Sequence, residues 1–562
     1  MSQDDPKQAL PPTRFARSSK DDAFTWHWDL SDKSLTDGVA IKLPPRHVVP
    51  IIFVPGIMGS NLRVTQDVDG VHRDEPVWLT NGGLGAAWEW SGASAARRQL
   101  RLNPAITDVY AGGDVPGFVA TIGDEKVIRE QRYWGEVSGM SYLQFLQWLQ
   151  STLNGPTYDD PSRKNAWVLL NQRDFSAQWG ALDAFVKQSS ADVGHAALIR
   201  FPVYACGYNW LQSNLKSAEQ LSKRIDEIIE ANNFAPLICD QVILVTHSMG
   251  GLVARACSEL KGMSGKIAGI VHGVMPATGA AAAYKRARAG TEGMAGAVLG
   301  SNAETVSAVF ANAPGALQLL PNQFYPKRWL KIGRGTGANF VELAAIPERD
   351  PYTEIYGLPD AQGHSVRGAW WSLMREELIN PARVQTHPGW ERYLRNLELA
   401  KSFHTDLGTR YHHDTYVFYG DDSGDDRMTW ECVRWECKGV RNIANPSIYD
   451  KSVPPNTTGA ALMKLPSWYD DGQGECGVRS GNDGYRLQLS SKDTGGDGTV
   501  PAVSGHAPQE AKAQYGATVA QVYRLRGFEH QAAYDNEQAR QATLHSILQI
   551  AAKIQFDKKV KA

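Results

Sequence analysis

The stretch from Val242 to Ala256, VILVTHSMGGLVARA, limits the possible folds of this chain more than any other feature. Its β-branched apolar run predicts a buried strand, and the glycine-led segment after it predicts a helix. Ser248 stands between them, where a sharp turn lifts a serine hydroxyl clear of a sheet and leaves the next backbone N–H free to bind an oxyanion. Thr246 replaces the first glycine of the G-x-S-x-G pattern and is expected to crowd the turn, so an ordinary strand-loop-helix connection stays an alternative.

Short apolar runs alternate with amphipathic helical segments along much of the chain. Besides the run before Ser248, the strand-like segments lie at 48–54, 195–206, 267–275 and 416–419. Apolar residues recur at helical spacing from Leu215 to Ile229. This alternation predicts a doubly wound α/β fold, in which helices cover both faces of a mostly parallel sheet. Ligands bind such sheets outside the carboxyl ends of the strands, where Ser248 is expected to lie.

At 562 residues the chain is much longer than one typical domain, so a core of this class must carry insertions. We predict an N-terminal extension at 1–45, a core formed by 46–278 and 401–562, and a cap or lid at 279–400. Two insertions are expected within the core, one at about 62–190 with a helix near 141–153, and a loop-rich one at 421–490. The small residues that follow 279 predict a helical but weakly anchored lid.

Charge and hydropathy exclude several classes of function. The chain has 58 Lys and Arg against 60 Asp and Glu, spread along its length, so no nucleic-acid partner is expected. Its first residues, MSQDDPKQALPPTRFARSSKDD, have no apolar segment of the kind found in Sec-type signal peptides, which predicts synthesis in the cytosol. No window approaches the ~18 consecutive apolar residues of a membrane span, so contact with lipid is expected to be peripheral.

The six cysteines fall into two groups. Three lie in apolar runs and are expected to be small core residues: Cys206, Cys239 and Cys257. Three lie in loop-like sequence, where pairing stays open: Cys432, Cys437 and Cys476. The Cys432–Cys437 spacing has no matching second pair, so a zinc site is not expected.

A serine hydroxyl is a poor nucleophile, so Ser248 needs a histidine to take its proton and a carboxylate to orient that histidine. In sheets that carry such a serine turn, the acid and then the histidine follow along the chain. Asp497, in TGGDGTVPAVS, is the predicted acid because the flanking glycines form a tight loop. Asp421 or Asp422, which follow a strand, are the alternative acids. His530 follows a strand-like run at 519–525 and precedes a predicted helix at 536–554, and it is the predicted base.

Other histidines fit the role of base less well. His506 is so close to Asp497 in sequence that a loop position is expected. His545 falls within the terminal helix, and His247 lies on the turn itself and cannot easily reach back to the serine hydroxyl. Two more precede the predicted acid, which breaks the chain order: His412 and His413.

An oxyanion hole needs two N–H donors near the nucleophile. The Met249 N–H, directly after Ser248, is the first. The second is expected from the loop after an earlier strand, PGIMGS, whose glycines let the backbone approach a substrate closely. We predict the Ile57 N–H for that position, with an ordinary Pro-Gly turn as the alternative.

The predicted chemistry requires no cofactor. A carboxylate cluster after the 416–419 strand nevertheless offers hard oxygen ligands for a structural Ca²⁺. It lacks the spacing of a calcium loop, and a solvated acidic turn is the favoured interpretation. The cluster consists of Asp421, Asp422, Asp425 and Asp426.

Together, FVPGIMGSNL, GYNW, THSMGGLVARA, GDGTVP and FEH resemble the lipid-acting α/β-hydrolases related to lecithin:cholesterol acyltransferase and to GPI inositol-deacylases, over about 48–275 and 416–550. HGVMPATGAAAAYKRARAG and ANAPGALQLLP are similar to segments of the phospholipase effectors of bacterial type VI secretion systems. Matched residue by residue, the resemblance implies Ser248 as nucleophile, Asp497 as acid and His530 as base. The departure from the family pattern is Thr246.

The resemblance also implies a setting and partners. It implies an antibacterial toxin made without a signal peptide and delivered by a secretion apparatus or adaptor into the periplasm of a rival cell. The substrate is then a membrane phospholipid, and a cognate immunity protein protects kin. GDGTVP also resembles the acyltransferase side of the family, so transfer to an alcohol is one alternative. A hydrolase scaffold without turnover that acts as an interaction protein is the other.

Overall fold

The computed structural model describes residues 15–17, 24–26, 45–79, 90, 92–115, 125–154, 161–292, 300–384, 389–424, 426–444 and 451–556. The chain divides into two compact units, Met1–Pro44 and Pro45–Ala562. In the first unit, β1 (Phe15–Arg17) pairs antiparallel with β2 (Phe24–Trp26). The second unit contains all the other elements.

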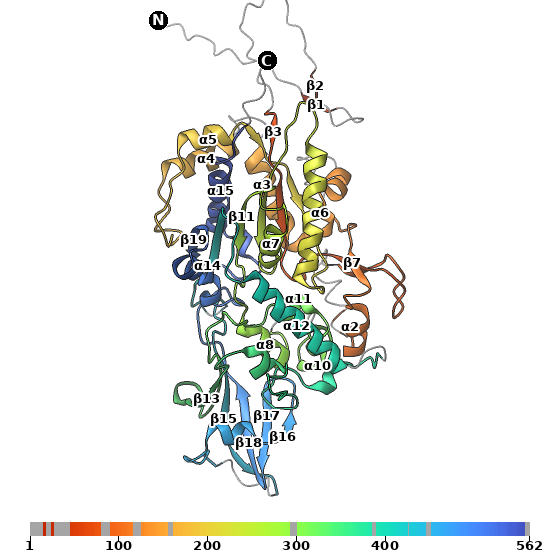
Figure 1. Cartoon of the computed structure of the whole chain (residues 1–562), viewed down its shortest axis with the longest axis vertical. Coiled ribbons are helices and arrows are strands. Elements are labelled where there is room, and N and C mark those ends of the chain that lie inside the picture. Colours follow the sequence, from red (N-terminus) through yellow and green to blue (C-terminus); the bar gives the residue numbers. More distant parts are fainter. Residues whose placement is uncertain are drawn as a thin grey trace, which may run out of the picture. The chain divides into compact units, whose positions relative to one another are not determined.

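Six parallel strands form the central sheet of the second unit (Figure 1). In sheet order they are β19 (Val519–Leu525), β14 (Thr415–Gly420), β11 (Ile267–Gly273), β10 (Val242–His247), β4 (Ile51–Val54) and β9 (Val203–Ala205). Two predicted runs are divided, because Pro50 and Pro202 have no N–H for a ladder. Their first parts pair separately as β3 (His47–Val48) and β8 (Ile199–Arg200).

The strand order reverses beside β4. The chain runs from β4 to the edge strand β9, returns across β4 to β10, and then adds β11, β14 and β19 in one direction. In open α/β sheets, ligands bind at the carboxyl ends of the strands where the order reverses. The segments at that point are the 55–60 loop, which follows β4, and Ser248, which follows β10.

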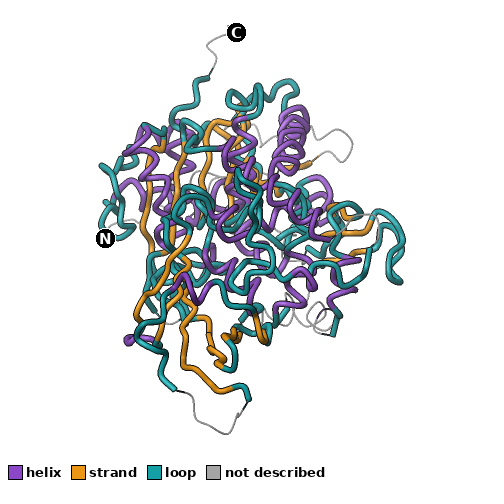
Figure 2. Tube along the Cα trace, turned by 60° about the horizontal axis from the view of Figure 1, so that its bottom comes forward, coloured by secondary structure: helices purple, strands orange, loops and turns teal. Residues whose placement is uncertain are grey.

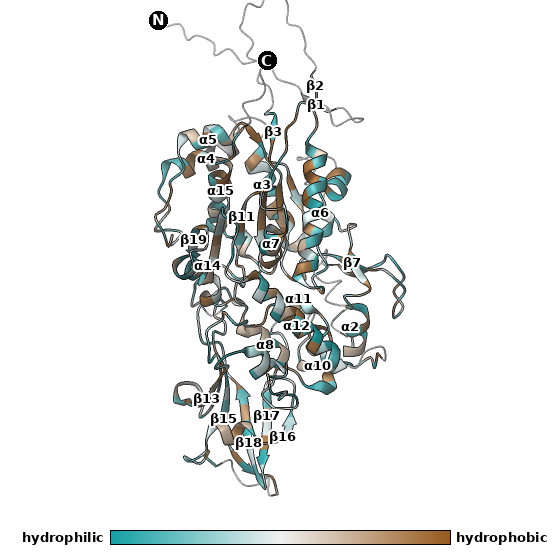
Figure 3. Cartoon of the chain, in the orientation of Figure 1, coloured by the Kyte–Doolittle hydropathy of each residue, from teal (hydrophilic) through white to brown (hydrophobic). Residues whose placement is uncertain are grey.

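Both faces of the sheet are buried. Along β4 and β10, alternate side chains enter two apolar clusters, with Phe53 and Val245 in one and Val54 and Leu244 in the other. The first face is covered by α3 (Gly139–Asn154) and α15 (Glu537–Ala551). The second is covered by α6 (Asn214–Asn232), α7 (Gly250–Glu259) and α14 (Ala502–Tyr515). Figure 3 shows hydrophobic and hydrophilic sides on α6. The predicted α/β class is confirmed.

The segment from 62 to 190 contains more regular structure than the one predicted helix, which is α3. A small sheet has the order β6 (Pro76–Trp78), β5 (Leu62–Val64), β7 (Thr107–Val109). Its other helices are α2 (Ala95–Arg101), η2 (Val127–Gln131), η3 (Trp134–Glu136), α4 (Pro161–Gln172) and, at its end, α5 (Ser190–Ala196). These elements are short or weakly amphipathic, so periodicity gives little sign of them.

The prediction that 421–490 is loop-rich is wrong, because this segment supplies four strands of a second six-stranded sheet. The order is β13 (Val341–Ile346), β12 (Leu330–Arg334), β15 (Val433–Asn442), β18 (Asp483–Leu489), β17 (Glu475–Ser480) and β16 (Ser467–Asp470). In β15 the buried Val433, Trp435 and Cys437 alternate with partly exposed polar residues. Charged residues between the buried ones make this alternation hard to recognise in the sequence. In addition, β15 pairs with β12, which lies far away in the sequence.

The other helices of this part are α8 (Ala281–Ala289), α10 (Ala303–Phe310), α11 (Pro314–Leu317), α12 (Gly389–Leu407) and α13 (Gly459–Met463). Single-turn helices are η4 (Gly337–Asn339), η5 (Tyr352–Tyr356), η6 (Glu376–Leu378) and η7 (Ala533–Asp535). In Figure 2 the strands, in orange, are accompanied by helices and long loops. None of the described helices is long and apolar enough to cross a membrane.

The prediction of a weakly anchored helix after residue 279 is wrong for α8. The Tyr284 hydroxyl donates to the Trp371 carbonyl at 2.7 Å and accepts from the Trp435 indole N–H at 2.9 Å. One turn later, the buried Arg288 forms an ion pair with Asp470 at 2.6 Å. Two large side chains therefore hold a helix whose other residues are mostly small. Residues 293–299, which belong to the same predicted segment, lie outside the described residues.

All six cysteines are free, and each lies within the described residues. Cys437 in β15 and Cys476 in β17 are both buried. The strand β18 lies between them, and its Leu487 pairs with Cys437 on one side and with Cys476 on the other. The three cysteines for which pairing stayed open from the sequence therefore form no disulfide in this structure.

Four buried histidines predict that the protein loses stability in acid. Burial lowers the pKa of His247 and His272 to about 3, and that of His404 and His545 to about 4, from 6.5. Below about pH 6.5 the unfolded chain therefore takes up protons that the folded chain excludes, so the stability present above that pH is lost as the pH falls. Each such group contributes a slope of about 1.4 kcal/mol per pH unit until its folded pKa is reached.

His545→Leu isolates one of these slopes. His545 stacks on Phe185, and its Nδ1 has no hydrogen-bond partner among the described residues. Urea unfolding measured from about pH 6.5 to 4.5 is expected to show a slope shallower by about 1.4 kcal/mol per pH unit in the variant. Parallel curves for the variant and the wild type would contradict the prediction.

Candidate active site

Ser248 lies on a tight turn between β10 and α7. Its φ is 52°, in the left-handed region that side chains with a Cβ rarely adopt. The conformation is held from both sides, because the Ser248 N–H donates to the Gly273 carbonyl and the Gly251 N–H donates to the Ser248 carbonyl, each at 2.9 Å. The predicted strand, turn and helix are all present. Such a local strain, imposed by the surrounding structure, is typical of functional positions.

The positions near this turn at which a side chain would clash with its neighbours are occupied by glycines, and position 246 is not one of them. A Cβ at Gly250 would lie 2.4 Å from the carbonyl oxygens of Val54 and Pro55. A Cβ at Gly56 would lie 2.8 Å from His247 Nδ1 and 3.0 Å from Ser248 Cβ. Contacts this short leave no room for a side chain, so the 55–60 loop and the serine turn touch through Gly56.

The expectation that Thr246 crowds the turn is therefore wrong. Thr246 is fully buried within β10, and its Oγ1 lies 3.0 Å from Nδ1 of His272 on the neighbouring strand β11. The threonine is accommodated because its hydroxyl has a polar partner across the sheet. Its backbone carbonyl accepts a hydrogen bond from the Tyr534 hydroxyl at 2.8 Å.

Ser248, His530 and Asp497 form one hydrogen-bonded series. His530 Nε2 lies 2.8 Å from Ser248 Oγ, and His530 Nδ1 lies 2.8 Å from Asp497 Oδ2. The other carboxylate oxygen, Oδ1, accepts from the N–H groups of Thr499 at 3.0 Å and Val500 at 2.7 Å. Asp497 and Ser248 are buried, and the His530 side chain is 14% exposed. The three residues predicted from separate segments thus meet in the order that general-base activation of a serine needs.

The 490–501 loop, which carries Asp497, is held by the segment that leads into the second sheet. The Thr429 N–H donates to the Thr494 carbonyl at 2.9 Å, and the Trp430 indole N–H donates to the Ser490 carbonyl at 3.1 Å. On another side, Arg286 of α8 donates to Thr499 Oγ1 at 3.2 Å. The acid therefore depends on contacts from outside the central sheet.

The alternative acids bind elsewhere. Asp422 accepts from the N–H groups of Gly424 and Gly527, both at 3.0 Å, and the Gly424 bond contributes most to lowering its pKa. Asp421 forms an ion pair with Arg524 at 3.7 Å. No group of three or more His, Cys, Asp or Glu among the described residues is placed to hold a metal ion. Of the candidate calcium ligands, Asp426 lies within the described residues and Asp425 outside them.

The remaining histidines serve other contacts. His506, expected in a loop, lies on α14, with its Nδ1 3.3 Å from the Tyr419 hydroxyl. His545 is buried in α15, and His412 Nε2 lies 3.3 Å from the Ser264 carbonyl. His413 pairs with Asp414 at 3.4 Å. His247 Nε2 contacts the His530 carbonyl at 2.8 Å, so it touches the backbone of the site and not the serine hydroxyl.

The 55–60 loop is held by three side chains. The Tyr208 hydroxyl donates to the Pro55 carbonyl at 2.9 Å, and the Trp78 indole N–H donates to the Met58 carbonyl at 2.9 Å. The Gly56 N–H donates to the Tyr142 hydroxyl at 3.2 Å. These contacts fix the loop against Ser248. Tyr142 and Trp78 were not predicted from the sequence, and Tyr208 belongs to GYNW, where no role was assigned to it.

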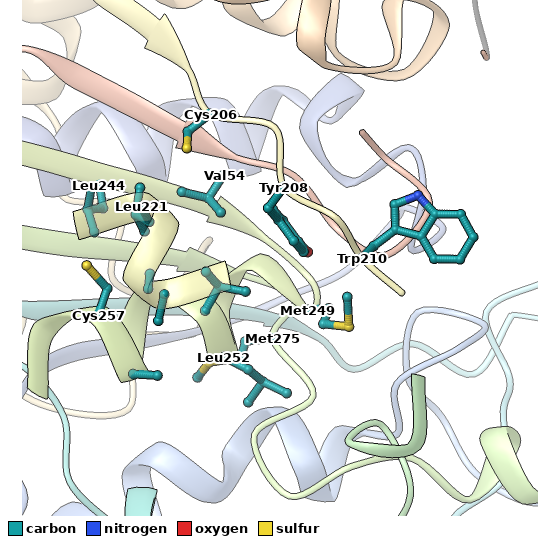
Figure 4. Packing of buried hydrophobic residues seen from close by; sticks show 14 of the residues in the cluster. Val54, Cys206, Tyr208, Trp210, Leu221, Leu244, Met249, Leu252, Cys257 and Met275 are labelled. Atoms are coloured by element: carbon teal, nitrogen blue, oxygen red, sulfur yellow. The ribbon is translucent and has the colours of Figure 1, made fainter. Parts of the chain in front are cut away.

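The two predicted oxyanion donors are free. Within the described part of the chain, the N–H groups of Ile57 and Met249 have no hydrogen-bond partner. The Met249 side chain is fully buried beside Leu252 and Met275 (Figure 4), which fixes the direction of its backbone. Met249 is fully buried, where an unpaired backbone donor is uncommon, and Ile57 is partly buried; both belong to segments that border Ser248.

Gly56→Ala is expected to lower kcat on an activated ester by about 10²–10³-fold, the cost of misplacing one oxyanion donor. The added Cβ must displace either His247 or Ser248, both of which are fixed by hydrogen bonds. Gly265→Ala is the matched control, because nothing lies within 4 Å of its added Cβ. Steady-state kinetics of the two variants checks the prediction, and equal rates for both would contradict it.

Comparison with known proteins places this architecture. No protein-family model and no curated protein matched the sequence. Among solved structures, a chain from the crystal structure of the Tle4–Tli4 complex matches with a TM-score of 0.70 at 28% identity, covering 90% of this chain and 99% of that chain. The protein resembles the type VI secretion phospholipase effectors. The resemblance first indicated by sequence motifs is thereby confirmed over nearly the whole chain.

Proposed function

We propose that this protein is a serine phospholipase that hydrolyses carboxylic ester bonds of membrane phospholipids through an acyl-enzyme. The observation that carries the proposal is the series from Ser248 through His530 to Asp497, with 2.8 Å at each link that involves His530. Ser248 Oγ attacks the ester carbonyl while His530 Nε2 takes its proton. His530 then gives that proton to the leaving alcohol, and the acyl group stays on Ser248.

Deacylation uses the same groups in reverse order. His530 takes a proton from water, the resulting hydroxide attacks the acyl-enzyme, and the fatty acid leaves as Ser248 recovers its proton. Asp497 keeps the proton of neutral His530 on Nδ1, so that Nε2 is free to accept, and stabilises the imidazolium. The Ile57 and Met249 N–H groups bind the oxyanion in both steps. Because every proton and charge has a partner in the chain, the chemistry requires no cofactor.

We propose an α/β-hydrolase core formed by 46–278 and 401–562, with 279–400 acting as a cap. The reversal of strand order beside Ser248 supports the core, and the contact of α8 with the 490–501 loop supports the cap. Ser248 is only 5% exposed, so a phospholipid ester reaches it when covering residues move. A displaced cap would then border the acyl chains at the membrane surface.

The resemblance to type VI effectors supports a role as an antibacterial toxin. We propose that the protein is made in the bacterial cytoplasm and is delivered by a secretion apparatus or adaptor, by a non-Sec route, to the periplasm of a target cell. There it contacts membranes peripherally. The match to the Tle4–Tli4 complex supports a cognate immunity protein as a partner.

Fluorophosphonate labelling of the purified protein, followed by mass spectrometry of phospholipid vesicles exposed to it, tests the function. A label on Ser248 and release of free fatty acid with lysophospholipid are expected. With an added alcohol acceptor, ester product in excess of fatty acid would identify an acyltransferase instead. A protein that takes up no label and leaves the lipids intact would be an interaction scaffold, and the proposal would fall.

A further inference from the structure

A continuous series of hydrogen bonds joins the 55–60 loop to the backbone of His530. The Gly56 N–H donates to the Tyr142 hydroxyl at 3.2 Å, and the Tyr142 hydroxyl lies 3.1 Å from His247 Nδ1. His247 Nε2 lies 2.8 Å from the His530 carbonyl. The series thus connects the loop with one oxyanion donor, the serine turn and the segment that carries the base.

The two ends of this series fix the position of every proton within it. A carbonyl oxygen only accepts, so His247 Nε2 must carry the proton that is donated to His530. His247 is fully buried and its pKa is lowered to about 3 by burial, so the ring is neutral and its Nδ1 must accept. The Tyr142 hydroxyl therefore donates to Nδ1 and accepts from Gly56, and all three bonds run in one direction.

We infer that Tyr142 and His247 are positioning residues that hold the oxyanion loop and the catalytic histidine in register across Ser248. The inference rests on the proposed function, because it assigns roles relative to that reaction. Tyr142 lies on α3, which packs on the opposite side of the sheet from α7. Its ring edge lies 2.8 Å from where a Cβ at Gly59 would be, so the tyrosine is wedged against the 55–60 loop.

The geometry explains why both residues act through others. Tyr142 and His247 are each 1% exposed, so neither is placed to touch a phospholipid. His247 turns its ring away from the serine hydroxyl, which His530 contacts. Loss of either residue leaves Ser248, His530 and Asp497 in the chain but frees the His530 backbone or the Gly56 N–H to shift. A displacement of about 1 Å at reacting groups costs on the order of 100-fold in rate.

Tyr142→Phe and His247→Asn, singly and together, test the inference. Tyr142→Phe removes both bonds of the tyrosine hydroxyl, whereas the shorter asparagine is expected to meet Tyr142 and to lose the bond to the His530 carbonyl. Each single variant is expected to lower kcat by about 10–100-fold with KM within about two-fold, because substrate contacts are untouched. The double variant is expected to fall no further than the worse single one, whereas independent effects would multiply.

Two tyrosine variants serve as controls. Tyr393→Phe removes an equally buried hydroxyl that donates to the Tyr356 carbonyl at 2.7 Å, far along the chain from the site, and should keep wild-type kcat. Tyr208→Phe removes a hydroxyl that holds the same loop without any bond to His530, so its effect should multiply with that of His247→Asn. Thermal unfolding shows that each variant is folded.

Fluorophosphonate labelling separates the two proposals. If the wild type is labelled and Tyr142→Phe is labelled several-fold more slowly, both stand. If the wild type is labelled but Tyr142→Phe matches it in labelling and kcat, or the double variant is multiplicative, the positioning inference is overturned and the phospholipase proposal remains. If the wild type itself takes no label, the proposed function is overturned, and the positioning inference, which rests on it, is overturned as well.

Discussion

Ser248→Ala is expected to lower kcat on a phospholipid or a short-chain nitrophenyl ester by about 10⁴–10⁶-fold. No other described hydroxyl is hydrogen-bonded to His530 Nε2, so the acyl-enzyme cannot form. The proposed oxyanion donors stay in place and account for the expected residual rate over water. Steady-state kinetics with free fatty acid as product measures the loss.

Ser248→Gly is the matched variant, because it removes the same hydroxyl but suits the positive φ of 52°. We expect it to be as inactive as Ser248→Ala and to be the more stable of the two by about 1 kcal/mol, since the strain of a Cβ in this conformation is gone. Urea unfolding compares the two. Wild-type turnover in either variant would remove Ser248 from the mechanism.

Asp497→Asn is expected to lower kcat by about 10⁴-fold, because it selects the wrong tautomer of His530. The two N–H groups of Thr499 and Val500 point at Oδ1, so the asparagine oxygen must stay there and its NH₂ must face His530. His530 Nδ1 then accepts, its proton moves to Nε2, and Nε2 no longer takes the proton of Ser248. Steady-state kinetics on an activated ester measures this loss. Because asparagine and aspartate have the same size, the loss does not come from a change in packing.

Asp421→Asn is the control for this assignment, because Asp421 was an alternative acid and its side chain forms a partly exposed ion pair with Arg524 at 3.7 Å. It should keep kcat within about two-fold, because a partly exposed ion pair contributes little and this one does not contact His530. An equal loss in Asp421→Asn and Asp497→Asn would show that the acid has been misassigned.

The central sheet was predictable because its strands are local signals. Each of the predicted runs is short, apolar and buried on both faces, as parallel strands in an α/β sheet must be. The order of Ser248, Asp497 and His530 followed from two motifs after strands and from the glycine-rich loop around Asp497. What the sequence could not supply was their distances, which depend on how the 490–501 loop is held by residues 429–430.

The second sheet and the supports of the site were missed for a physical reason. β12 pairs with β15 across a long sequence separation, and their polar residues hide the alternation, so no local window reveals the sheet. In the same way, Thr246 fits at this turn because its Oγ1 meets His272 Nδ1 on the neighbouring strand, a contact that the motif itself does not reveal. Tyr142 belongs to no motif, and only the packing of α3 brings it to Gly56.

The anchoring of the 490–501 loop ties the candidate site of this protein to its second sheet. β18 leads directly into that loop, and residues 429–430 at the entrance to β15 hold it in place. Removal of 421–490 would therefore eliminate the residues that hold the loop of Asp497 together with four strands of the second sheet, and a chimaera that receives this segment from a relative must reproduce the same contacts. The second sheet is therefore not an exchangeable module. Changes to its outer strands should leave residues 429–430 and the 490–501 loop unaltered.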